Sequence, residues 1–430
     1  MAVKDTSLST RSLSLDSQSL SQMLVENENI LIIQDLDGVC MSLVKDPLTR
    51  TMDIRYLEAA RSLGKHFYVL TNGEHIGKRG VNGIVEQAIE NSPTAHTESL
   101  YLQGLAGGGV QWQDYNGTVS HPGVSDKEML FLASVPNKIS ACLRGLGTQP
   151  KYKIDQSKLN EYIQATVLDN KVSPTVNLNV FHEVLKDSPD LYADFQQQIK
   201  AFVEGLLVEA RENDLGDSFF IHYAPNLGRD ERGKEIMQPS QGKDSGTTDF
   251  QFMLRGGIKE VGVLVILNHY YYMQTGKYPL GKNFNARQAP REKTAWIKLA
   301  RDNFDPAIMP TIVGVGDTVT SKAVENNGHI EFKRGGSDRG FLELIQALGK
   351  EFNTGNVVVY IDSSSGEVKN RKPLKLDNSN PNNIKVIEGV GDPRDTEDPL
   401  ILNFVFPGGH EEYINFFCNM ANIRASRQIN

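Results

Sequence analysis

Short apolar runs without polar alternation recur along the chain, and each ends in small or acidic polar residues. Residues 30–33 form the first run and lead towards Asp35, and residues 67–70 form the second and stop at Thr71. Runs of this length are typical of strands that are buried on both faces. The pattern therefore predicts a parallel sheet with chemistry at the carboxyl ends of its strands.

Three later runs extend the predicted sheet. Residues 310–315 lead towards Asp317, and residues 357–361 and 400–406 repeat the pattern. Near the end of the chain, residues 411–423 carry large apolar side chains at helical spacing, which predicts a helix. The predicted fold class is α/β, with a Rossmann-like parallel sheet and flanking helices.

The stretch between the second and third runs has a different pattern. Residues 157–167 and 191–213 are amphipathic, which predicts two helices, and residues 219–223 have the composition of a strand. We interpret residues 118–238 as an α+β domain that is inserted into the sheet domain.

The sheet domain then consists of residues 29–117 and 239–430, on either side of the insertion. Residues 1–28 are rich in Ser and poor in aromatic residues. This composition predicts a mobile tail or an appended helix of low stability. We expect no chemistry in that segment.

Composition excludes several classes of protein. The 430 residues carry 45 Lys and Arg against 53 Asp and Glu, a net charge of −8, which argues against a general nucleic-acid binder. The longest apolar run, residues 261–267, is far shorter than the roughly 20 residues of a membrane-spanning helix. The three widely spaced cysteines and the absence of an apolar leader core favour a cytoplasmic protein with free thiols. Any metal should therefore be held by oxygen ligands.

Asp35 and Asp37 are the first candidates for chemistry. The two-residue period of an extended chain places both carboxylates on one side, and Gly38 permits a tight turn beside them. An Asp-x-Asp-Gly sequence alone is as typical of a turn as of a reactive site. The site is favoured because Thr71 and Asp317 follow other strands, and because Lys243 precedes a predicted helix.

These elements occur in the order found in the haloacid dehalogenase-like phosphatases, which the chain resembles. Residues 35–38 match the family's Asp-x-Asp-Gly motif, Thr71 its second motif, Lys243 its lysine, and the Gly-Asp pair at 316–317 its fourth motif. The inserted domain resembles the large α/β cap of the family's sugar-phosphate phosphatases. A small-molecule sugar phosphate is therefore the expected partner, and neither nucleic acid nor a membrane is expected.

The resemblance implies roles for the acidic residues. Asp35 would be the nucleophile that forms an aspartyl-phosphate, and Asp37 would protonate the leaving oxygen and then deprotonate water. Asp35, Asp317 and the backbone carbonyl of Asp37 would bind Mg²⁺. This hard cation prefers oxygen ligands and offsets the repulsion between carboxylates and a phosphate.

Phosphate oxygens would be held by Thr71, Asn72 and Lys243, again as the resemblance implies. The part of the substrate beyond the phosphate must be selected by other residues, because a phosphate-centred site cannot tell one alcohol from another. The candidates for that role are Glu74, His75, His222, Arg229 and Arg232.

One position departs from the family's pattern. Many relatives carry a second acid about four residues after the one matched by Asp317, where this chain has Ser321. Asp338 is a candidate replacement in a supporting position. Taken alone, Lys243 is more typical of a solvated surface lysine. The alternative reading from another class is a non-catalytic protein that binds a sugar phosphate.

Overall fold

The computed structural model describes residues 8–77, 79–90, 92–290, 292–326, 329–380 and 384–429. Its centre is an eight-stranded sheet in the order β18-β15-β12-β1-β2-β3-β4-β5. The six strands from β18 to β3 are parallel, and β4 and β5 complete the sheet in antiparallel pairing. In chain order the strands are β1 (Ile30–Gln34), β2 (Phe67–Leu70), β3 (Gly104–Ala106), β4 (Gln111–Gln113), β5 (Val119–Ser120), β12 (Thr311–Gly316), β15 (Val357–Ile361) and β18 (Phe404–Phe406). The predicted α/β class is confirmed.

Helices cover both faces of this sheet because its strands are apolar on both sides. Ile30 and Ile32 of β1 face one helical layer, and Leu31 and Ile33 face the other. The first layer contains α1 (Ser17–Glu26), α2 (Ile54–Leu63), α3 (Val81–Ala88), α4 (Ser92–Thr97) and α12 (Gly409–Ile429). The second contains α9 (Lys259–Thr275), α10 (Lys293–Asn303) and α11 (Arg339–Phe352).

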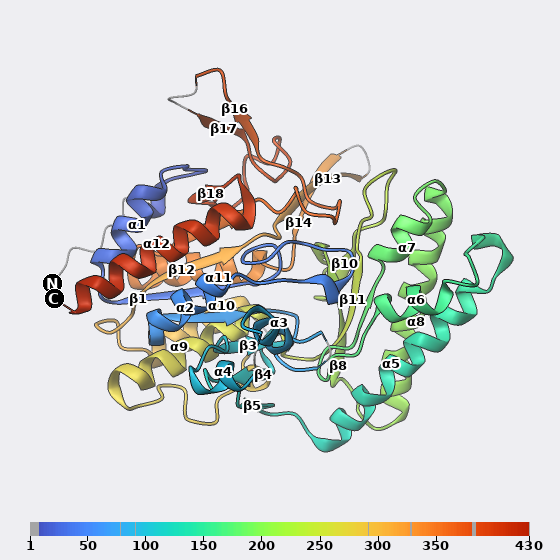
Figure 1. Ribbon diagram of the computed structural model, residues 1–430, viewed down its shortest axis with the longest axis horizontal. Coiled ribbons are helices and arrows are strands. Elements are labelled where there is room, and N and C mark those ends of the chain that lie inside the picture. The colour runs from blue at the N-terminus through green and yellow to red at the C-terminus, as the bar shows by residue number, and fades with distance from the viewer. Residues whose placement is uncertain are drawn as a thin grey trace.

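The N-terminal segment packs onto the sheet domain. Leu20 and Leu24 of α1 are buried, and α1 lies beside α12, as Figure 1 shows. The Arg424 guanidinium donates hydrogen bonds to the backbone carbonyls of Leu24, Asn27 and Glu28. Of the two predicted possibilities, a mobile tail or an appended helix, the described residues 8–28 show the appended helix α1, and two leucines four residues apart give it the apolar face that packs. Residues 1–7 lie outside the described part.

A second body, the cap, has its own sheet and core, and its helices lie to the right in Figure 1. Its four strands run in the order β6-β7-β11-β8. They are β6 (Val167–Leu168), β7 (Thr175–Asn177), β8 (Phe219–Ala224) and β11 (Asp249–Leu254). The helices are α5 (Asp126–Gly147), α6 (Leu159–Thr166), α7 (Asn179–Val184) and α8 (Pro189–Glu212).

The cap sheet reaches beyond the predicted end of the insertion at residue 238. Strand β11 pairs with β7 on one side and with β8 on the other, and its side chains contribute to the cap core. The chain therefore returns to the main sheet only after Leu254, shortly before α9 begins at Lys259. The sequence hid this strand because it follows a Gly-rich and Ser-rich loop that reads as a linker.

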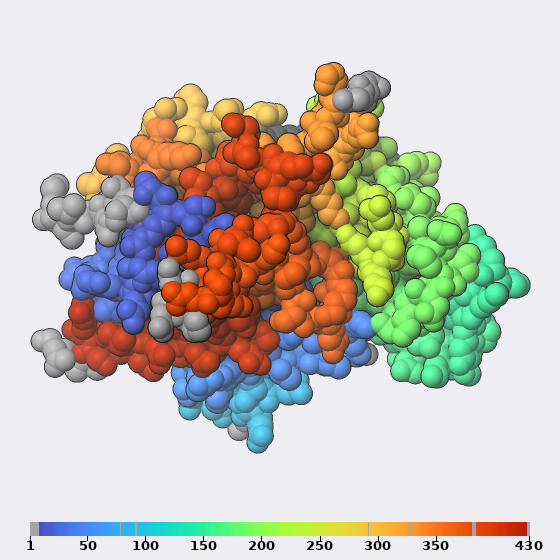
Figure 2. Space-filling view, turned by 90° about the horizontal axis from the view of Figure 1, so that it is seen from above, coloured from blue at the N-terminus to red at the C-terminus, as the bar shows by residue number. Residues whose placement is uncertain are grey.

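Three antiparallel strand pairs lie outside the two larger sheets. They are β9 (Asn226–Arg229) with β10 (Glu235–Met237), β13 (Thr320–Asn326) with β14 (His329–Gly335), and β16 (Lys375–Asp377) with β17 (Lys385–Glu388). A wide cleft of about 940 Å³ lies between the cap and the loops after β12 and β15. Figure 2 shows these orange and red core segments opposite the green cap.

Candidate active site

The carboxyl ends of three neighbouring strands bring Asp35, Thr71 and Asp317 together. Asp35 follows β1, Thr71 follows β2 and Asp317 follows β12, and β1 lies between the other two strands. All three residues are buried and line one inner cavity of about 110 Å³ beneath the cap. The prediction that these strand ends meet is therefore matched by the structure.

Three carboxylates could hold a metal ion in this cavity. Oxygens of Asp35, Asp317 and Asp338 lie within 4.8 Å of one another, and all three side chains are buried. Oδ1 of Asp35 has no hydrogen-bond partner, although a buried carboxylate oxygen needs one. An all-oxygen donor set with an unpartnered oxygen fits a hard divalent cation.

Burial shapes the acidity of these groups. Burial raises the pKa of Asp317 to about 6 and raises the pKa of Asp35 well above its usual range, even though Lys259 opposes the shift at Asp35. Asp317 also accepts hydrogen bonds from the hydroxyls of Thr318 at 2.7 Å and Ser363 at 2.6 Å. The cluster thus carries crowded negative charge that a bound cation would relieve.

Lys259 is the cation of this cluster, and sequence reasoning missed it. Its Nζ lies 2.8 Å from Asp35 Oδ2 and 2.7 Å from Asp338 Oδ1, and its side chain is 2% exposed. Burial opposes its charge, but the two carboxylates outweigh burial and raise the pKa of Lys259. Lys243, the predicted lysine, lines the wide outer cleft instead. The available signal was a lysine that opens a buried helix directly after the inserted domain.

Asp338 takes up the supporting position for which it was a candidate. Its Oδ2 accepts hydrogen bonds from the backbone N–H groups of Asp317 and Thr318, both at 2.9 Å. Burial disfavours its charge, but Lys259 and these donors outweigh burial and lower the pKa of Asp338. Ser321, where relatives carry an acid, instead donates a hydrogen bond to Asp395 Oδ2 at 2.5 Å.

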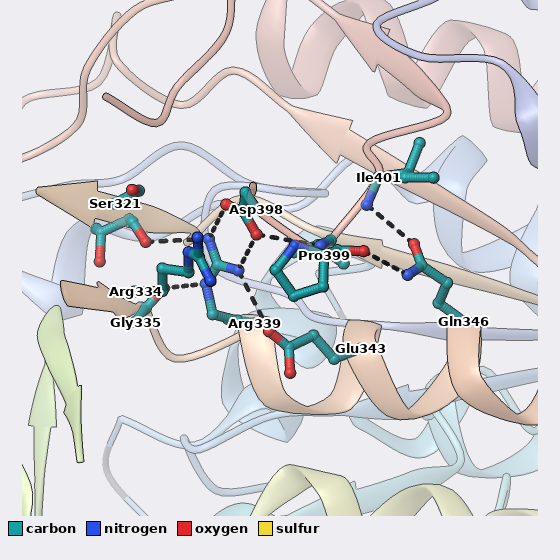
Figure 3. Close-up of polar contacts among 12 residues, drawn as sticks. Ser321, Arg334, Gly335, Arg339, Glu343, Gln346, Asp398, Pro399 and Ile401 are labelled. Atoms are coloured by element: carbon teal, nitrogen blue, oxygen red, sulfur yellow. Dashed lines mark hydrogen bonds and ion pairs between the residues drawn. The ribbon is translucent and has the colours of Figure 1, made fainter. Parts of the chain in front are cut away.

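The start of α11 is anchored next to Asp338. Figure 3 shows Arg339 between Glu343 and Asp398, and the Arg339–Asp398 ion pair is 2.7 Å long. Gln346 donates to the carbonyl of Pro399 and accepts from the N–H of Ile401. These contacts fix the first turns of the helix against the loop before β18, and with them the position of Asp338.

The carboxylate of Asp37 is not part of the cluster that Asp35, Asp317 and Asp338 form. This carboxylate lies 2.9 Å from Nε of Arg50, and both residues line the inner cavity. Gly38, which follows it, has φ +78°, and a Cβ at this residue would lie 2.3 Å from Asp317 Oδ2. Only glycine lets the turn after β1 approach Asp317 so closely. Of the predicted metal ligands, the carboxylates of Asp35 and Asp317 are brought together, and the backbone carbonyl of Asp37 stays a prediction.

The two predicted phosphate-binding residues of the β2 loop lie in the inner cavity. Oγ1 of Thr71 accepts a hydrogen bond from the Gly73 N–H at 3.1 Å. Nδ2 of Asn72 lies 2.9 Å from Nε2 of His222, a cap residue. The loop after β2 is therefore in direct contact with the cap.

Glu74 and His75 make internal contacts. The Glu74 carboxylate accepts hydrogen bonds from three successive N–H groups of the cap, those of Lys171, Val172 and Ser173. His75 is fully buried, and its ring contacts the Gly104 carbonyl and the Gln113 amide. Glu74 reaches the edge of the cavity, whereas His75 does not line it.

The remaining predicted substrate residues lie outside the cavity lining. His222 Nδ1 is 2.9 Å from Glu235 Oε2, so its ring joins that carboxylate to Asn72. Arg229 lies within 3.7 Å of both Glu235 and Glu260. Arg232 is exposed in the turn between β9 and β10. The sequence could not separate them from residues that line the cavity, because the side to which a polar residue points depends on the tertiary fold.

Arg371 is a second cation that the sequence analysis did not select. It donates a hydrogen bond to Thr318 Oγ1 at 2.8 Å, and its Nε lies 3.5 Å from Asp317 Oδ2. It lines both the inner cavity and the wide outer cleft. Its side chain therefore marks the boundary between the two spaces.

Comparison with known sequences decides the family. The sequence model of the family described as glucosylglycerol-phosphate phosphatase (Salt_tol_Pase) matches residues 29–421. The chain is also 54% identical over 411 residues to "Glucosylglycerol-phosphate phosphatase" of Synechocystis sp., and the alignment covers 96% of this chain and 97% of that protein. The chain belongs to the glucosylglycerol-phosphate phosphatase family.

This membership confirms the prediction of a phosphatase. The Ser-rich leader and the motifs at residues 35–40, 69–75 and 314–321 resemble the glucosylglycerol-phosphate phosphatases in particular, and this resemblance is confirmed. Among the described residues, we find no helix that is long and apolar enough to cross a membrane.

Two solved structures that the chain matches at low sequence identity are titled trehalose-6-phosphate phosphatase. The C-terminal domain of C. albicans trehalose-6-phosphate phosphatase is 9% identical, with a TM-score of 0.47, and the match covers 96% of this chain and 98% of that one. The trehalose-6-phosphate phosphatase of Aspergillus fumigatus is 8% identical, with a TM-score of 0.38, and the match covers 96% of this chain and 99% of that one.

Proposed function

We propose that the chain hydrolyses glucosylglycerol 3-phosphate to glucosylglycerol and phosphate, with Mg²⁺ as cofactor and an aspartyl-phosphate intermediate. The observation that carries this proposal is the buried cluster of Asp35 and Asp317 at the ends of neighbouring strands, with Lys259 of α9 against Asp35. Family membership supports the substrate, since the 54% identical relative is named for it.

The proposed reaction has two steps. First, a carboxylate oxygen of Asp35 attacks phosphorus, the bond from phosphorus to the glycerol oxygen breaks, and Asp37 gives its proton to that oxygen. Then water attacks the same phosphorus, Asp37 takes the water proton, and the bond to Asp35 breaks to release phosphate. The acid is needed because a glycerol alkoxide is a poor leaving group.

Cationic and hydrogen-bonding groups hold the phosphate during both steps. Lys259 lies against Asp35, and Thr71 and Asn72 line the same cavity. Asp35, Asp317 and the backbone carbonyl of Asp37 are the proposed Mg²⁺ ligands, with Asp338 in support. When bound, Mg²⁺ supplies charge that offsets the repulsion between these carboxylates and the phosphate.

The proposed product, glucosylglycerol, suggests a biosynthetic role for the reaction. The family resemblance implies that glucosylglycerol is a compatible solute made in salt adaptation, and we expect a cytoplasmic enzyme. The synthase that makes the phosphorylated substrate is the protein partner that we expect. Sucrose- or trehalose-phosphate hydrolysis is the alternative activity within the same fold, and non-catalytic sugar-phosphate binding is the alternative from another class.

Release of inorganic phosphate from glucosylglycerol 3-phosphate, with and without Mg²⁺, tests the proposal. Sucrose 6-phosphate and trehalose 6-phosphate complete the substrate panel, and relative kcat/KM separates the three activities. We expect glucosylglycerol 3-phosphate to be the best substrate and Asp35→Asn to abolish turnover. An Asp35→Asn variant as active as the native chain would exclude the nucleophile, and no hydrolysis of any panel member would exclude catalysis.

A further inference from the structure

One face of the cap sheet is polar although it is buried. On β11, Asp249 and Gln251 are two residues apart and point to the same side, because side chains alternate along a strand. Their partners across the pairing to β7 are Asn177 and Thr175, and Gln251 also pairs with His222 of β8. All these side chains therefore share one face of the sheet.

The opposite face of the same strands is apolar. Val176 of β7, Tyr223 of β8, and Phe250 and Phe252 of β11 belong to the cap core beneath α5 and α8. The cap sheet thus has one face that packs against the cap helices and another that faces the sheet domain. A face that served only to rest on that domain would be expected to be apolar too, since burying polar groups costs free energy unless they gain partners.

The polar face forms the roof of the inner cavity. Thr175, Asn177, Asp249 and Gln251 line this cavity together with Asp35, Lys259 and other core residues. Oε1 of Gln251 is buried and has no hydrogen-bond partner, and the whole residue is 9% exposed. An unsatisfied amide oxygen in such a place requires a donor that enters the cavity from outside.

Asp249 is the second acceptor of this roof. Its carboxylate accepts a hydrogen bond from Nδ2 of Asn177 at 2.6 Å. Burial raises the pKa of Asp249 to about 6, which indicates that water solvates it poorly. The polar face itself carries no lysine or arginine. Arg50 and Arg371, the core cations that influence Asp249, are already bound to Asp37 and to Thr318 respectively.

We propose that Asp249 and Gln251 of the cap sheet select a neutral, polyhydroxylated leaving group by accepting hydrogen bonds from its hydroxyls. Sugar hydroxyls can supply the donor that Oε1 of Gln251 lacks, and Asn177, which already donates to Oδ1 of Asp249, holds that carboxylate in place to accept another. The carboxylate of Asp249 also disfavours a leaving group that bears a second phosphate or a carboxylate. This assignment rests on the proposed function and names the residues that recognise the sugar part of its substrate.

The roles of Asp249 and Gln251 can be tested with two substrates that differ only in the presence of the sugar. Steady-state kinetics with Mg²⁺ are measured on glucosylglycerol 3-phosphate and on glycerol 3-phosphate, which has the same phosphate and lacks the glucosyl group. For Asp249→Asn and Gln251→Leu, we expect kcat/KM to fall about 10-fold or more on the first substrate, the worth of a lost hydrogen bond to a charged or buried acceptor. On glycerol 3-phosphate, we expect a change of less than about 2-fold.

Two control variants and a test of folding accompany the kinetic measurements. Asp217→Asn and Gln197→Leu change the same residue types at exposed places of the cap and should leave both substrates unaffected. Thermal unfolding checks that Asp249→Asn, which keeps the side-chain shape, is folded. An equal loss on both substrates, or no loss on either, would overturn the assignment.

Failure of the proposed function gives a different result. If the native chain does not hydrolyse glucosylglycerol 3-phosphate, binding of glucosylglycerol itself is measured by calorimetry. Binding that Gln251→Leu weakens about 10-fold would support the sugar site without the activity. Binding that is undetectable, or that Gln251→Leu leaves unchanged, would overturn the sugar site as well.

Discussion

Nζ of Lys259 lies 2.8 Å from Oδ2 of Asp35, although the two residues are 224 positions apart in the chain. Lys259 is the first residue of α9, and Asp35 follows β1. The lysine also binds Asp338, so one cation is shared between a carboxylate proposed as nucleophile and another that supports the loop after β12. The pair couples the assembly of the site to the docking of α9.

Lys259 and Lys243 make a matched pair for mutation. Lys259→Met should lower kcat/KM by about 1,000-fold or more, because it removes a buried charge that we place on the phosphate oxygens. It should also lower the free energy of unfolding by about 3 kcal/mol, since it leaves buried carboxylates without their partner. Lys243→Met, in the outer cleft, should change either quantity little. Enzyme assays and urea unfolding check both, and equal effects of the two variants would contradict the assignment.

The turn after β1 offers a second test. Gly38→Ala places a Cβ 2.3 Å from Asp317 Oδ2 at a residue with φ +78°, so Asp317 must move. We expect kcat to fall at least about 10-fold and the apparent Mg²⁺ affinity to weaken, because Asp317 is a proposed ligand. Kinetic titration with Mg²⁺ measures both.

Gly64→Ala is the control for this substitution. Gly64 also has a positive φ of +55°, but nothing lies within 4 Å of an added Cβ. Because its ψ is −128°, outside the left-handed helical region, Gly64→Ala should cost about 1–3 kcal/mol of stability from backbone strain and leave the Mg²⁺ titration unchanged. A Gly38→Ala enzyme with a native Mg²⁺ titration would show that Asp317 does not depend on the close turn.

The sequence predicts those site residues that a local pattern marks, and it misses those that only contacts between distant parts of the chain bring to the site. Asp35, Thr71 and Asp317 each follow a short apolar run, so local pattern and the geometry of parallel sheets were enough to bring them together. Lys259 opens the buried helix α9 directly after the inserted domain, and this local position alone does not show which carboxylates it meets. Its role depends on where α9 docks, which only the tertiary fold decides.

The cap illustrates the same limit. Strand β11 was assigned to the sheet domain, because its connection to β7 and β8 spans a long loop that the local pattern does not reveal. The candidate substrate residues were therefore chosen without this strand, and their role in binding stays a prediction. Asp249 and Gln251 lie on that missed strand, and they line the cavity, whereas Arg229 and Arg232 do not.

The contact between Glu74 and the cap predicts a role in holding the cap. Three successive N–H groups of residues 171–173 donate to one buried carboxylate, and Ser173 adds its hydroxyl. Glu74→Gln replaces one acceptor oxygen with an NH₂ that faces N–H donors. We expect a loss of about 2 kcal/mol in stability, the cost of an unsatisfied buried group.

Hydrogen exchange locates that effect. The amides of residues 171–173 should exchange faster in Glu74→Gln than in the native chain, because they lose their acceptor. Glu90→Gln, an exposed residue of the same charge, is the control. Unchanged protection of these amides would show that Glu74 does not hold the cap loop.

His75 gives the chain a stability that depends on pH. Burial lowers the pKa of His75 to about 4 from its ordinary 6.5, and the neutral ring bridges the Gly104 carbonyl and the Gln113 amide. Because the unfolded state binds the proton more readily, this contribution is fully present above about pH 6.5 and is lost as the pH falls towards 4. Between pH 8 and pH 5 the loss should be about 2 kcal/mol.

The variant His75→Gln isolates this contribution, because its amide can keep both hydrogen bonds and does not titrate. The free energy of unfolding from urea titrations, measured from pH 8 to pH 5, should fall less steeply for the variant than for the native chain. His96→Gln, at an exposed histidine, should follow the native curve. Parallel curves for His75→Gln and the native chain would mean that His75 does not take up a proton on unfolding in this range.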